Sequence, residues 1–392
     1  MTEILWLARS IPLPLNSGDK LYTGKLASSV AEAGARVRYV GLADEPFDLP
    51  KSELSKKVEW IVVPGSKRSI VAGMFSREPM VGARYGTESY RKLIESLLKP
   101  NHPKVIVLDQ YGLAFLLSEL QVLGYRGAIV HIAHDFETLV TRSLARAYQG
   151  NSLRKLALQL NARKTKTAEI RLAHSSNLVV TLTERDASEF RRIGARNTLV
   201  VPPGYDRPVV FKPWSVEGRL RRVAIIGSFE WTAKQVNLSN FLVAADSHFA
   251  AANISIDVVG MVPAALRAEL EPKLSATRFH GFVDDLGKIF QQSRFGLIIE
   301  ETGGGFKLKT LDYVFNGLPV AALSGSFEGI PESVAKHFLV EKDLPALVNS
   351  IIKMIDNDDE LSTMRTGALN AAKGKFDWGV GANNFISAVE NL

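Results

Sequence analysis

Short apolar runs recur along almost the whole chain and alternate with longer segments that have helical patterning. This alternation constrains the fold more than any other feature, because parallel strands need long crossover connections, which are usually helices. Many of the runs are almost continuously apolar, as expected for parallel strands covered on both faces. The predicted strands cover residues 4–8, 37–42, 58–63, 105–108, 128–132, 178–182, 198–201, 222–226, 255–259, 277–282, 295–299, 318–323 and 338–340.

The order of these elements predicts an α/β protein with two doubly wound, Rossmann-like domains in tandem. A length of 392 residues agrees with two domains. Pro and Gly cluster at residues 202–208, and a new strand starts at Arg222, which indicates a linker between the domains. We therefore predict one domain at residues 1–205, a second at 206–375, and a helical segment at 376–392 whose packing the sequence does not indicate.

Composition and charge narrow the possible functions. The chain has no Cys, which excludes disulfides, thiol nucleophiles and Cys metal sites. No apolar run has the length of a membrane span, and the start of the chain lacks the features of a signal peptide, so we expect a cytoplasmic protein. Residues 1–207 hold 30 Lys and Arg against 20 Asp and Glu, which favours an anionic partner such as lipid headgroups or a phosphorylated substrate. No motif indicates binding to nucleic acid.

A basic, leucine-containing segment at residues 151–166 suggests how such a protein meets a membrane. It has the composition of a basic amphipathic helix that lies on an anionic surface, here the inner face of the membrane. The alternative is a crossover helix with a solvated basic face.

Three glycines, Gly303, Gly304 and Gly305, lie where the predicted strand at 295–299 turns into a helix. Backbone N–H groups and the helix dipole can hold a phosphate at such a turn. The helix then presents Lys309 and Asp312 one turn apart on one face. A cation for phosphate and a carboxylate for sugar hydroxyls suit a nucleotide-sugar ligand. The alternatives are a flexible turn, a solvated lysine and an intrahelical ion pair between the two side chains.

Several motifs in order along the chain resemble the GT-B glycosyltransferases, whose two Rossmann-like domains face a cleft. The resemblance is closest to the family-four retaining enzymes, especially exopolysaccharide-type sugar transferases. It covers nearly the whole chain. The motifs are Ser17-Gly18-Asp19-Lys20, Val130 to Asp135, Val201-Pro202-Pro203-Gly204-Tyr205-Asp206, Ile226-Gly227-Ser228-Phe229-Glu230-Trp231, Phe279 to Asp285, Lys309-Thr310-Leu311-Asp312, Gly317-Leu318-Pro319-Val320 and Phe327-Glu328-Gly329-Ile330.

The resemblance implies a transferase that moves a sugar from a nucleoside diphosphate sugar to a hydroxyl of a saccharide or lipid-linked acceptor. It also implies retention of configuration, a role in surface polysaccharide or glycoconjugate synthesis, and no cofactor or obligatory metal. Lys309 would clamp the diphosphate, Asp312 would bind the ribose, and His134 would contact the donor sugar near the reacting carbon. The other implied donor residues are Gly227, Lys234, Glu301, Gly303, Gly304 and Gly305, and the acceptor residues are Gly18, Asp19 and Asp135.

The chain departs from the family at one position. The family has two Glu eight residues apart near the nucleotide, whereas here Asp312 stands at the second position and Gly304 at the first. Two other functions stay open, namely a nucleotide-sugar epimerase of the same fold and a non-catalytic protein that binds a sugar nucleotide, and the missing Glu favours the second of these. A dinucleotide-dependent oxidoreductase is disfavoured, because the early loop lacks the G-x-G-x-x-G fingerprint.

Overall fold

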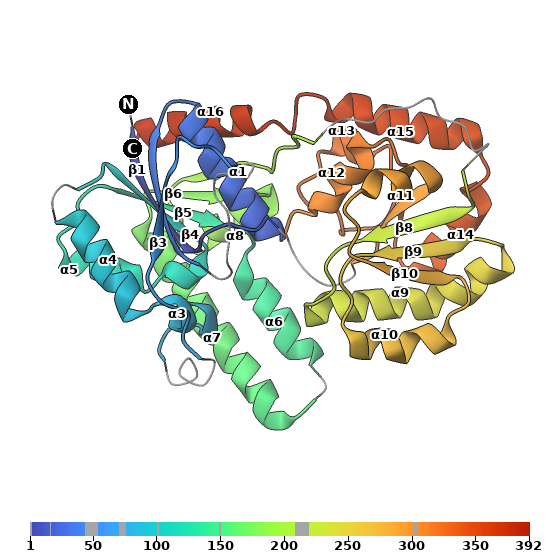
Figure 1. Ribbon diagram of the computed structural model, residues 1–392, viewed down its shortest axis with the longest axis horizontal. Helices are drawn as coiled ribbons and strands as arrows, with labels where there is room; N and C mark the ends of the chain where they lie inside the picture. The colour runs from blue at the N-terminus through green and yellow to red at the C-terminus, as the bar shows by residue number, and fades with distance from the viewer. Residues whose placement is uncertain are drawn as a thin grey trace. The chain divides into compact units, whose positions relative to one another are not determined.

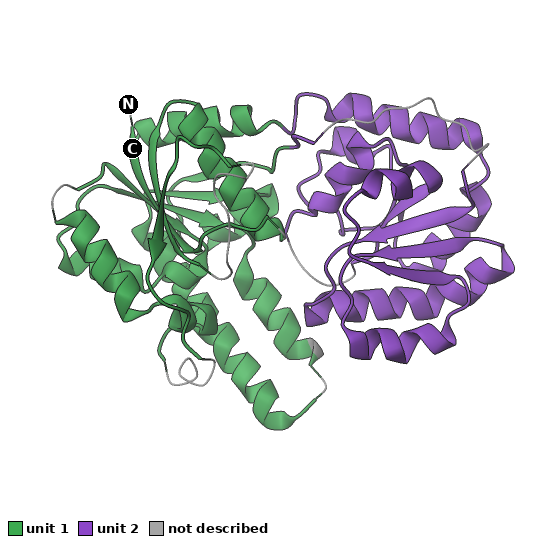
Figure 2. Cartoon of the chain, in the orientation of Figure 1, with its two compact units in different colours: residues 1–204, 377–392 green, residues 205–376 purple. Residues whose placement is uncertain are grey.

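The structure is a computed structural model that describes residues 2–15, 17–43, 54–69, 76–99, 102–148, 150–207, 219–300 and 305–392. The chain divides into two compact units (Figure 2). Unit 1 comprises residues 1–204 and 377–392, and unit 2 comprises residues 205–376. The last helical segment, whose packing the sequence left open, therefore belongs to the first unit.

Unit 1 contains a seven-stranded parallel sheet in the order β3-β2-β1-β4-β5-β6-β7. The chain adds strands on one side of β1 and then on the other, so the switch point of this doubly wound sheet lies between β1 and β4. The strands are β1 (Glu3–Ser10), β2 (Arg36–Leu42), β3 (Glu59–Val63), β4 (Val105–Asp109), β5 (Ala128–Ala133), β6 (Leu178–Thr181) and β7 (Thr198–Val200).

The described helices of unit 1 lie between these strands in the chain order, except α16, which follows unit 2 (Figure 1). They are α1 (Gly18–Glu32), α3 (Met80–Tyr85), α4 (Glu88–Leu98), α5 (Leu116–Val122), α6 (Glu137–Ala147), α7 (Ser152–Ser175), α8 (Glu184–Arg192) and α16 (Trp378–Glu390), with a 3₁₀ turn at Tyr111–Leu113.

Unit 2 contains a six-stranded parallel sheet in the order β10-β9-β8-β11-β12-β13. This is the strand order of a Rossmann fold, with its switch point between β8 and β11. The strands are β8 (Arg222–Ile226), β9 (Ser255–Val259), β10 (Thr277–Gly281), β11 (Phe295–Ile298), β12 (Val320–Leu323) and β13 (Leu339–Glu341). The helices are α9 (Thr232–Ala251), α10 (Ala264–Leu270), α11 (Leu286–Gln292), α12 (Leu308–Phe315), α13 (Glu332–Ala335), α14 (Leu344–Met354) and α15 (Asp358–Ala372), with a 3₁₀ turn at Glu271–Lys273.

Both faces of the unit 2 sheet are covered by apolar core, which explains why its strands are almost continuously apolar. In β8, Val223 and Ile225 belong to one core cluster, whereas Ala224 and Ile226 belong to another. All four side chains are buried. Successive residues of a strand point to opposite faces, so neither face of β8 meets solvent. The predicted fold class is confirmed, and each predicted strand corresponds to one observed strand, with ends that differ by up to two residues.

Helix α16 packs against the first helix of unit 1 and against the sheet. The ring of Phe385 lies 5.7 Å from that of Trp6 on β1, and the ring of Trp378 lies 5.8 Å from that of Tyr22 on α1. All four of these aromatic side chains are buried. Helix α16 therefore contributes core residues to unit 1, the unit that also contains β1.

Helix α7 includes the predicted basic segment and continues well beyond it. Helices α6 and α7 lie side by side and project away from the sheet of unit 1 (Figure 1). The first half of α7 exposes Leu153, Leu156 and Leu160, of which 76%, 52% and 44% are accessible. The second half is anchored, since Ala168 and Leu172 are buried in the core of unit 1.

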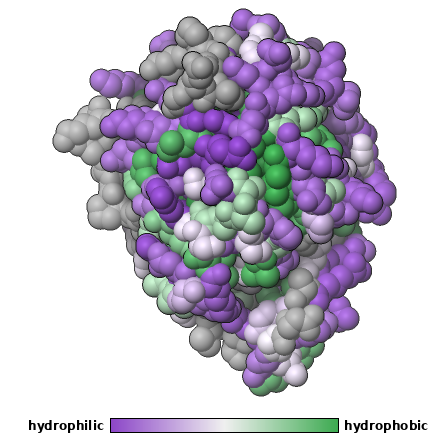
Figure 3. Space-filling model, turned by 90° about the vertical axis from the view of Figure 1, so that its right-hand side faces the viewer, coloured by the Kyte–Doolittle hydropathy of each residue, from purple (hydrophilic) through white to green (hydrophobic). Residues whose placement is uncertain are grey.

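The surface has no single apolar region on the face drawn in Figure 3, where hydrophobic patches are separated by hydrophilic residues. In the part of the chain that the structure describes, no helix is both long enough and apolar enough to cross a membrane.

Candidate functional site

In unit 2 the predicted donor residues that the structure describes lie at the carboxyl edge of the sheet, next to the switch point. Gly227 follows β8, and the helix that carries Lys309 and Asp312 follows β11. Two glycines bring backbone segments together at this edge, because a Cβ added to Gly260 would lie 1.9 Å from the carbonyl oxygen of Gly227. Doubly wound folds bind ligands outside the carboxyl ends of the strands that flank the switch point.

Lys309 lies in the first turn of α12, and its ammonium forms a buried ion pair with the carboxylate of Glu300. Burial opposes the charge of Glu300, but the neighbouring Lys309 holds the pKa of that carboxyl below its ordinary value. The second oxygen of Glu300, Oε2, is buried and has no hydrogen-bond partner among the described residues. Lys309 is thus a charged group at the edge of the sheet whose counter-ion comes from the end of β11.

Asp312, one turn further along α12, is not paired with Lys309. Its Oδ1 accepts a hydrogen bond from Nη1 of Arg207 at 2.9 Å, and 15% of its side chain is exposed. Burial raises the pKa of Asp312 to about 6, against the lowering effect of Arg207. The intrahelical ion pair that the spacing allowed is therefore replaced by two separate pairs, each with a partner outside the helix.

The structure gives less detail on the other predicted donor residues. Lys234 is exposed on the first turn of α9. Gly305 has a φ of +73°, a left-handed conformation that favours glycine. Glu301, Gly303 and Gly304 lie outside the described residues. Helix α12 ends at Phe315, Gly317 has a φ of +62°, and β12 starts at Val320.

Three large apolar side chains are exposed in loops at the same edge of unit 2. Trp231 follows β8, Met261 follows β9 and Phe282 follows β10, with 70%, 52% and 71% of their surfaces accessible. Phe229, by contrast, is a core residue of unit 2 with 4% exposed.

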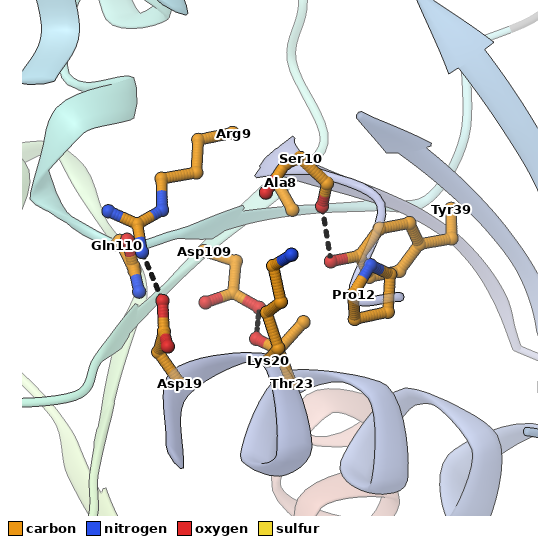
Figure 4. A pocket seen from close by; sticks show the side chains of 10 residues that line it. All are labelled: Ala8, Arg9, Ser10, Pro12, Asp19, Lys20, Thr23, Tyr39, Asp109 and Gln110. Carbon is orange, nitrogen blue, oxygen red and sulfur yellow. Dashed lines mark hydrogen bonds and ion pairs between the residues drawn. The ribbon is translucent and has the colours of Figure 1, made fainter. Parts of the chain in front are cut away.

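In unit 1 a small pocket lies at the carboxyl ends of β1 and β4, beside α1 (Figure 4). Arg9 forms an ion pair with Asp19 across it. Although burial alone would raise the pKa of Asp19, the Arg9 guanidinium holds it well below its ordinary value. The pocket is lined by Ala8, Arg9, Ser10, Pro12, Asp19, Lys20, Thr23, Tyr39, Asp109 and Gln110.

The pocket borders the predicted histidine. His134 follows β5, and its Nε2 lies 2.7 Å from Oδ1 of Asp109, the last residue of β4. Asp109 is 1% exposed and also accepts hydrogen bonds from the indole of Trp6 and the hydroxyl of Thr23. The strand order places these groups together, because β1, β4 and β5 are neighbours in the sheet. The structure thus forms an Asp–His pair at the switch point of unit 1.

His131 differs from His134 in its surroundings. It is fully buried within β5, where its Nδ1 lies 3.0 Å from the carbonyl oxygen of Leu108. Burial lowers the pKa of His131 to about 4, so its ring is neutral at physiological pH. We therefore interpret His131 as a core residue.

The acceptor predictions lie around the same edge. Gly18 is the exposed first residue of α1, and Asp19 follows it in the pocket. Asp135 is half-buried after β5. Burial raises the pKa of Glu137 well above its ordinary value, and the nearby carboxyl groups of Asp135 and Glu169 raise it further.

Sequence analysis missed Arg9, Asp109 and Arg207. Asp109 is the last residue of β4 and Arg9 is the last but one of β1, so a charged residue after an apolar run was the available signal. It could be used only with the strand order, because 100 residues separate the two positions. In the described ranges, no group of three or more His, Cys, Asp or Glu side chains is arranged to hold a metal ion.

Comparisons with known proteins agree with this architecture. Residues 221–357 match the family model described as glycosyl transferases group 1. Among curated protein sequences, none matches the chain. Sucrose-phosphate synthase from Thermosynechococcus elongatus is similar in structure, with a TM-score of 0.74, 16% identity, and coverage of 100% of this chain and 99% of that chain.

Two further solved structures are similar along their whole length. HepE from Anabaena, in complex with UDP and glucose, has a TM-score of 0.67, 16% identity, and coverage of 100% of both chains. A UDP-forming α,α-trehalose-phosphate synthase from Burkholderia xenovorans has a TM-score of 0.67, 14% identity, and coverage of 100% of this chain and 99% of that chain. Together, the comparisons show that residues 221–357 form a group 1 glycosyl transferase domain and that the two units have the fold of the GT-B glycosyltransferases.

Proposed function

We propose that the chain transfers a sugar from a nucleoside diphosphate sugar to a hydroxyl of a saccharide or lipid-linked acceptor, with retention of configuration. The observation that carries the proposal is the position of Lys309 and Asp312, which lie one turn apart on α12 at the switch point of unit 2. The complexes of HepE with UDP, with UDP-glucose, and with UDP and glucose support a uridine nucleotide as the first donor to test.

The chemistry of such a transfer requires stabilisation of the leaving diphosphate. Lys309 would neutralise its developing negative charge, assisted by the N–H groups at the start of α12. The carboxylate of Asp312 would accept hydrogen bonds from the ribose hydroxyls in place of Arg207. Lys234 would add a second cation near the phosphates. In this mechanism no metal ion or other cofactor is required, because protein cations supply the positive charge.

The base of the nucleotide would lie against the exposed apolar side chains after β8, β9 and β10. Trp231, Met261 and Phe282 are exposed after three adjacent strands, and large apolar side chains suit the face of an aromatic base. The proposed donor site therefore extends along the carboxyl edge of the unit 2 sheet, with the base toward β10 and the phosphates toward β11.

The acceptor would bind to unit 1, at the edge formed by Gly18, Asp19, His134 and Asp135. We propose a lipid-linked or growing surface saccharide, because Leu153, Leu156 and Leu160 are exposed on one face of α7 beside Arg154 and Lys155. A helix that combines exposed leucines with cations can lie on an anionic membrane. The enzyme would then work as a peripheral membrane protein in polysaccharide or glycoconjugate synthesis.

The test starts with thermal stabilisation by UDP, GDP and ADP and their glucose conjugates, since a ligand that binds the native state raises its Tm. The best donor is then used in a turnover or hydrolysis assay. Lys309→Ala should lose most of the rate and stay folded, whereas Lys353→Ala, which removes an exposed lysine of α14, should keep it. Equal kcat and KM in Lys309→Ala and wild type would remove Lys309 as the clamp.

Two rival functions have distinct outcomes in the same assays. An epimerase would convert the donor without an acceptor, which product analysis detects; the family match gives this alternative no support. A non-catalytic sugar-nucleotide-binding protein would show stabilisation by a nucleotide sugar without turnover across the acceptors tested.

A further inference from the structure

Asp109 is a buried carboxylate, and each of its two oxygens faces a hydrogen-bonding group of another residue. Its Oδ2 accepts hydrogen bonds from Nε1 of Trp6 at 2.8 Å and from the hydroxyl of Thr23, and its Oδ1 lies 2.7 Å from Nε2 of His134. These three neighbours of Asp109 come from β1, from α1 and from the residue that follows β5. A carboxylate oxygen without a proton only accepts hydrogen bonds, and a histidine nitrogen that donates to such an oxygen carries the ring proton.

This contact determines which nitrogen of the neutral His134 ring can accept a hydrogen bond. With the proton on Nε2, Nδ1 presents a lone pair. No described residue forms a hydrogen bond with Nδ1. Because Nδ1 is also not a buried atom left without a partner, it is accessible to a ligand. The edge of the Tyr22 ring packs on the imidazole with 5.3 Å between centroids, which restricts the orientation of the ring.

The location of the pair connects it with ligand binding. Asp109 and Thr23 line the pocket at the switch point of unit 1 (Figure 4). His134 contacts both of these side chains. A neutral imidazole with an accessible lone pair accepts a hydrogen bond from a sugar hydroxyl, but it has no proton on that nitrogen to donate to a phosphate.

We propose that Asp109 is a positioning residue that keeps His134 in the Nε2–H form, so that Nδ1 accepts a hydrogen bond from a hydroxyl of the bound sugar. The kinetic part of this proposal rests on the proposed function, whereas the protonation state of the ring does not. Asparagine at position 109 would donate its amide N–H to Nε2, which would move the ring proton to Nδ1 and change that nitrogen from an acceptor to a donor.

The first experiment measures the protonation state of His134 directly in the full chain. The protein has seven histidines. Long-range ¹H–¹⁵N correlation spectra of ¹⁵N-histidine-labelled protein at pH 7.5 distinguish the two neutral forms and the cation, and His134→Gln assigns the signal. We expect the Nε2–H form in the wild type and the Nδ1–H form in Asp109→Asn. An Nδ1–H or cationic His134 in the wild type would overturn the proposal, even if Asp109→Asn does not fold.

Unit 2 offers a matched control. Asp257 is also a buried strand carboxylate that pairs with a histidine, His280, at 2.9 Å. Asp257→Asn should alter the signal of His280 and leave the signal of His134 unchanged. A change of His134 in both variants would show a general loss of structure instead of a local effect of Asp109.

The second experiment is a double-mutant cycle with the donor selected by thermal stabilisation, starting from UDP-glucose. Asp109→Asn should lower kcat/KM by about tenfold or more, as expected when a group that orients a functional histidine is changed. In a His134→Gln background the same change should have little further effect, because Asp109 acts through His134. An equal loss in both backgrounds would overturn the positioning role, and absence of turnover in the wild type would contradict the proposed function alone.

Discussion

Lys309 and Glu300 form an ion pair that is largely buried in unit 2, with 12% and 11% of their side chains exposed. The pair joins the end of β11 to the first turn of α12. We propose that the diphosphate of the donor binds here. Lys309 then has to exchange a carboxylate for a phosphate, which makes the pair relevant to both stability and binding.

Glu300→Gln should therefore have opposite effects on the free protein and on its nucleotide complex. Removing the carboxylate leaves the ammonium of Lys309 without its counter-ion, which should lower the free energy of unfolding by about 3 kcal/mol. UDP would supply the missing negative charge, so the increase in Tm at saturating UDP should be larger in Glu300→Gln than in the wild type.

The control for this prediction is Glu271→Gln, which breaks the exposed ion pair between Glu271 and Arg267 in the same unit. It should change neither Tm nor the effect of UDP noticeably, because exposed pairs contribute little. Equal increases in Tm with UDP for wild type and Glu300→Gln would show that the phosphates do not compete with Glu300.

The pKa of Asp312 predicts how donor affinity depends on pH. Burial raises this pKa to about 6, and only the deprotonated carboxylate accepts hydrogen bonds at both oxygens from ribose. KM for the donor should stay constant above pH 6 and rise about tenfold for each unit below it. The measurement is KM between pH 5 and pH 8 for wild type and Asp312→Asn. The variant should have a higher KM at pH 8 without this rise, so an identical pH profile in both proteins would exclude Asp312 as its cause.

The fold and the donor helix were accessible from the sequence for a simple physical reason. Strands that are covered on both faces have to be apolar along their length, as Val223, Ala224, Ile225 and Ile226 illustrate. Lys309 and Asp312 were found because both lie on one helix, where spacing alone determines the shared face.

The partners of these residues could not be predicted in the same way. Glu300, Arg207 and Asp109 meet their partners through the order of strands and the path of loops, which a single sequence does not encode as a local pattern. The pairing of Asp109 with His134 depends on β4 and β5 being neighbours. A charged residue at a strand end was visible, but its partner was not.

The leucines of α7 predict binding to anionic membranes. Leu153, Leu156 and Leu160 are exposed and lie at helical spacing beside Arg154 and Lys155. The protein should cosediment with liposomes that contain phosphatidylglycerol and less with pure phosphatidylcholine, because cations attract the anionic surface before the leucines insert. Replacing the three leucines with Ser should abolish the difference, whereas Val243→Ser, at another exposed apolar residue, should preserve it. Equal cosedimentation of wild type with both lipids would exclude this role.

Glu169 is a buried carboxyl in unit 1 that affects stability through its protonation. It accepts hydrogen bonds from the backbone N–H groups of Glu137 at 2.8 Å and Thr138 at 2.9 Å, and its side chain is fully buried. Burial nevertheless raises the pKa of Glu169 from 4.5 to about 7. The folded state therefore binds this proton more tightly than the unfolded chain does.

The sign of the pH dependence follows from this difference. The stabilisation from the bound proton is complete below pH 4.5 and is lost as the pH rises through 7, so this group should lower the free energy of unfolding by up to about 3 kcal/mol. Glu169→Gln is neutral at every pH and should remove that decline. Urea unfolding at pH 5 and pH 8 measures this decline in the free energy of unfolding. The control is Glu88→Gln, which replaces an exposed carboxyl of the same unit. The same decline in wild type and Glu169→Gln would assign it to other groups.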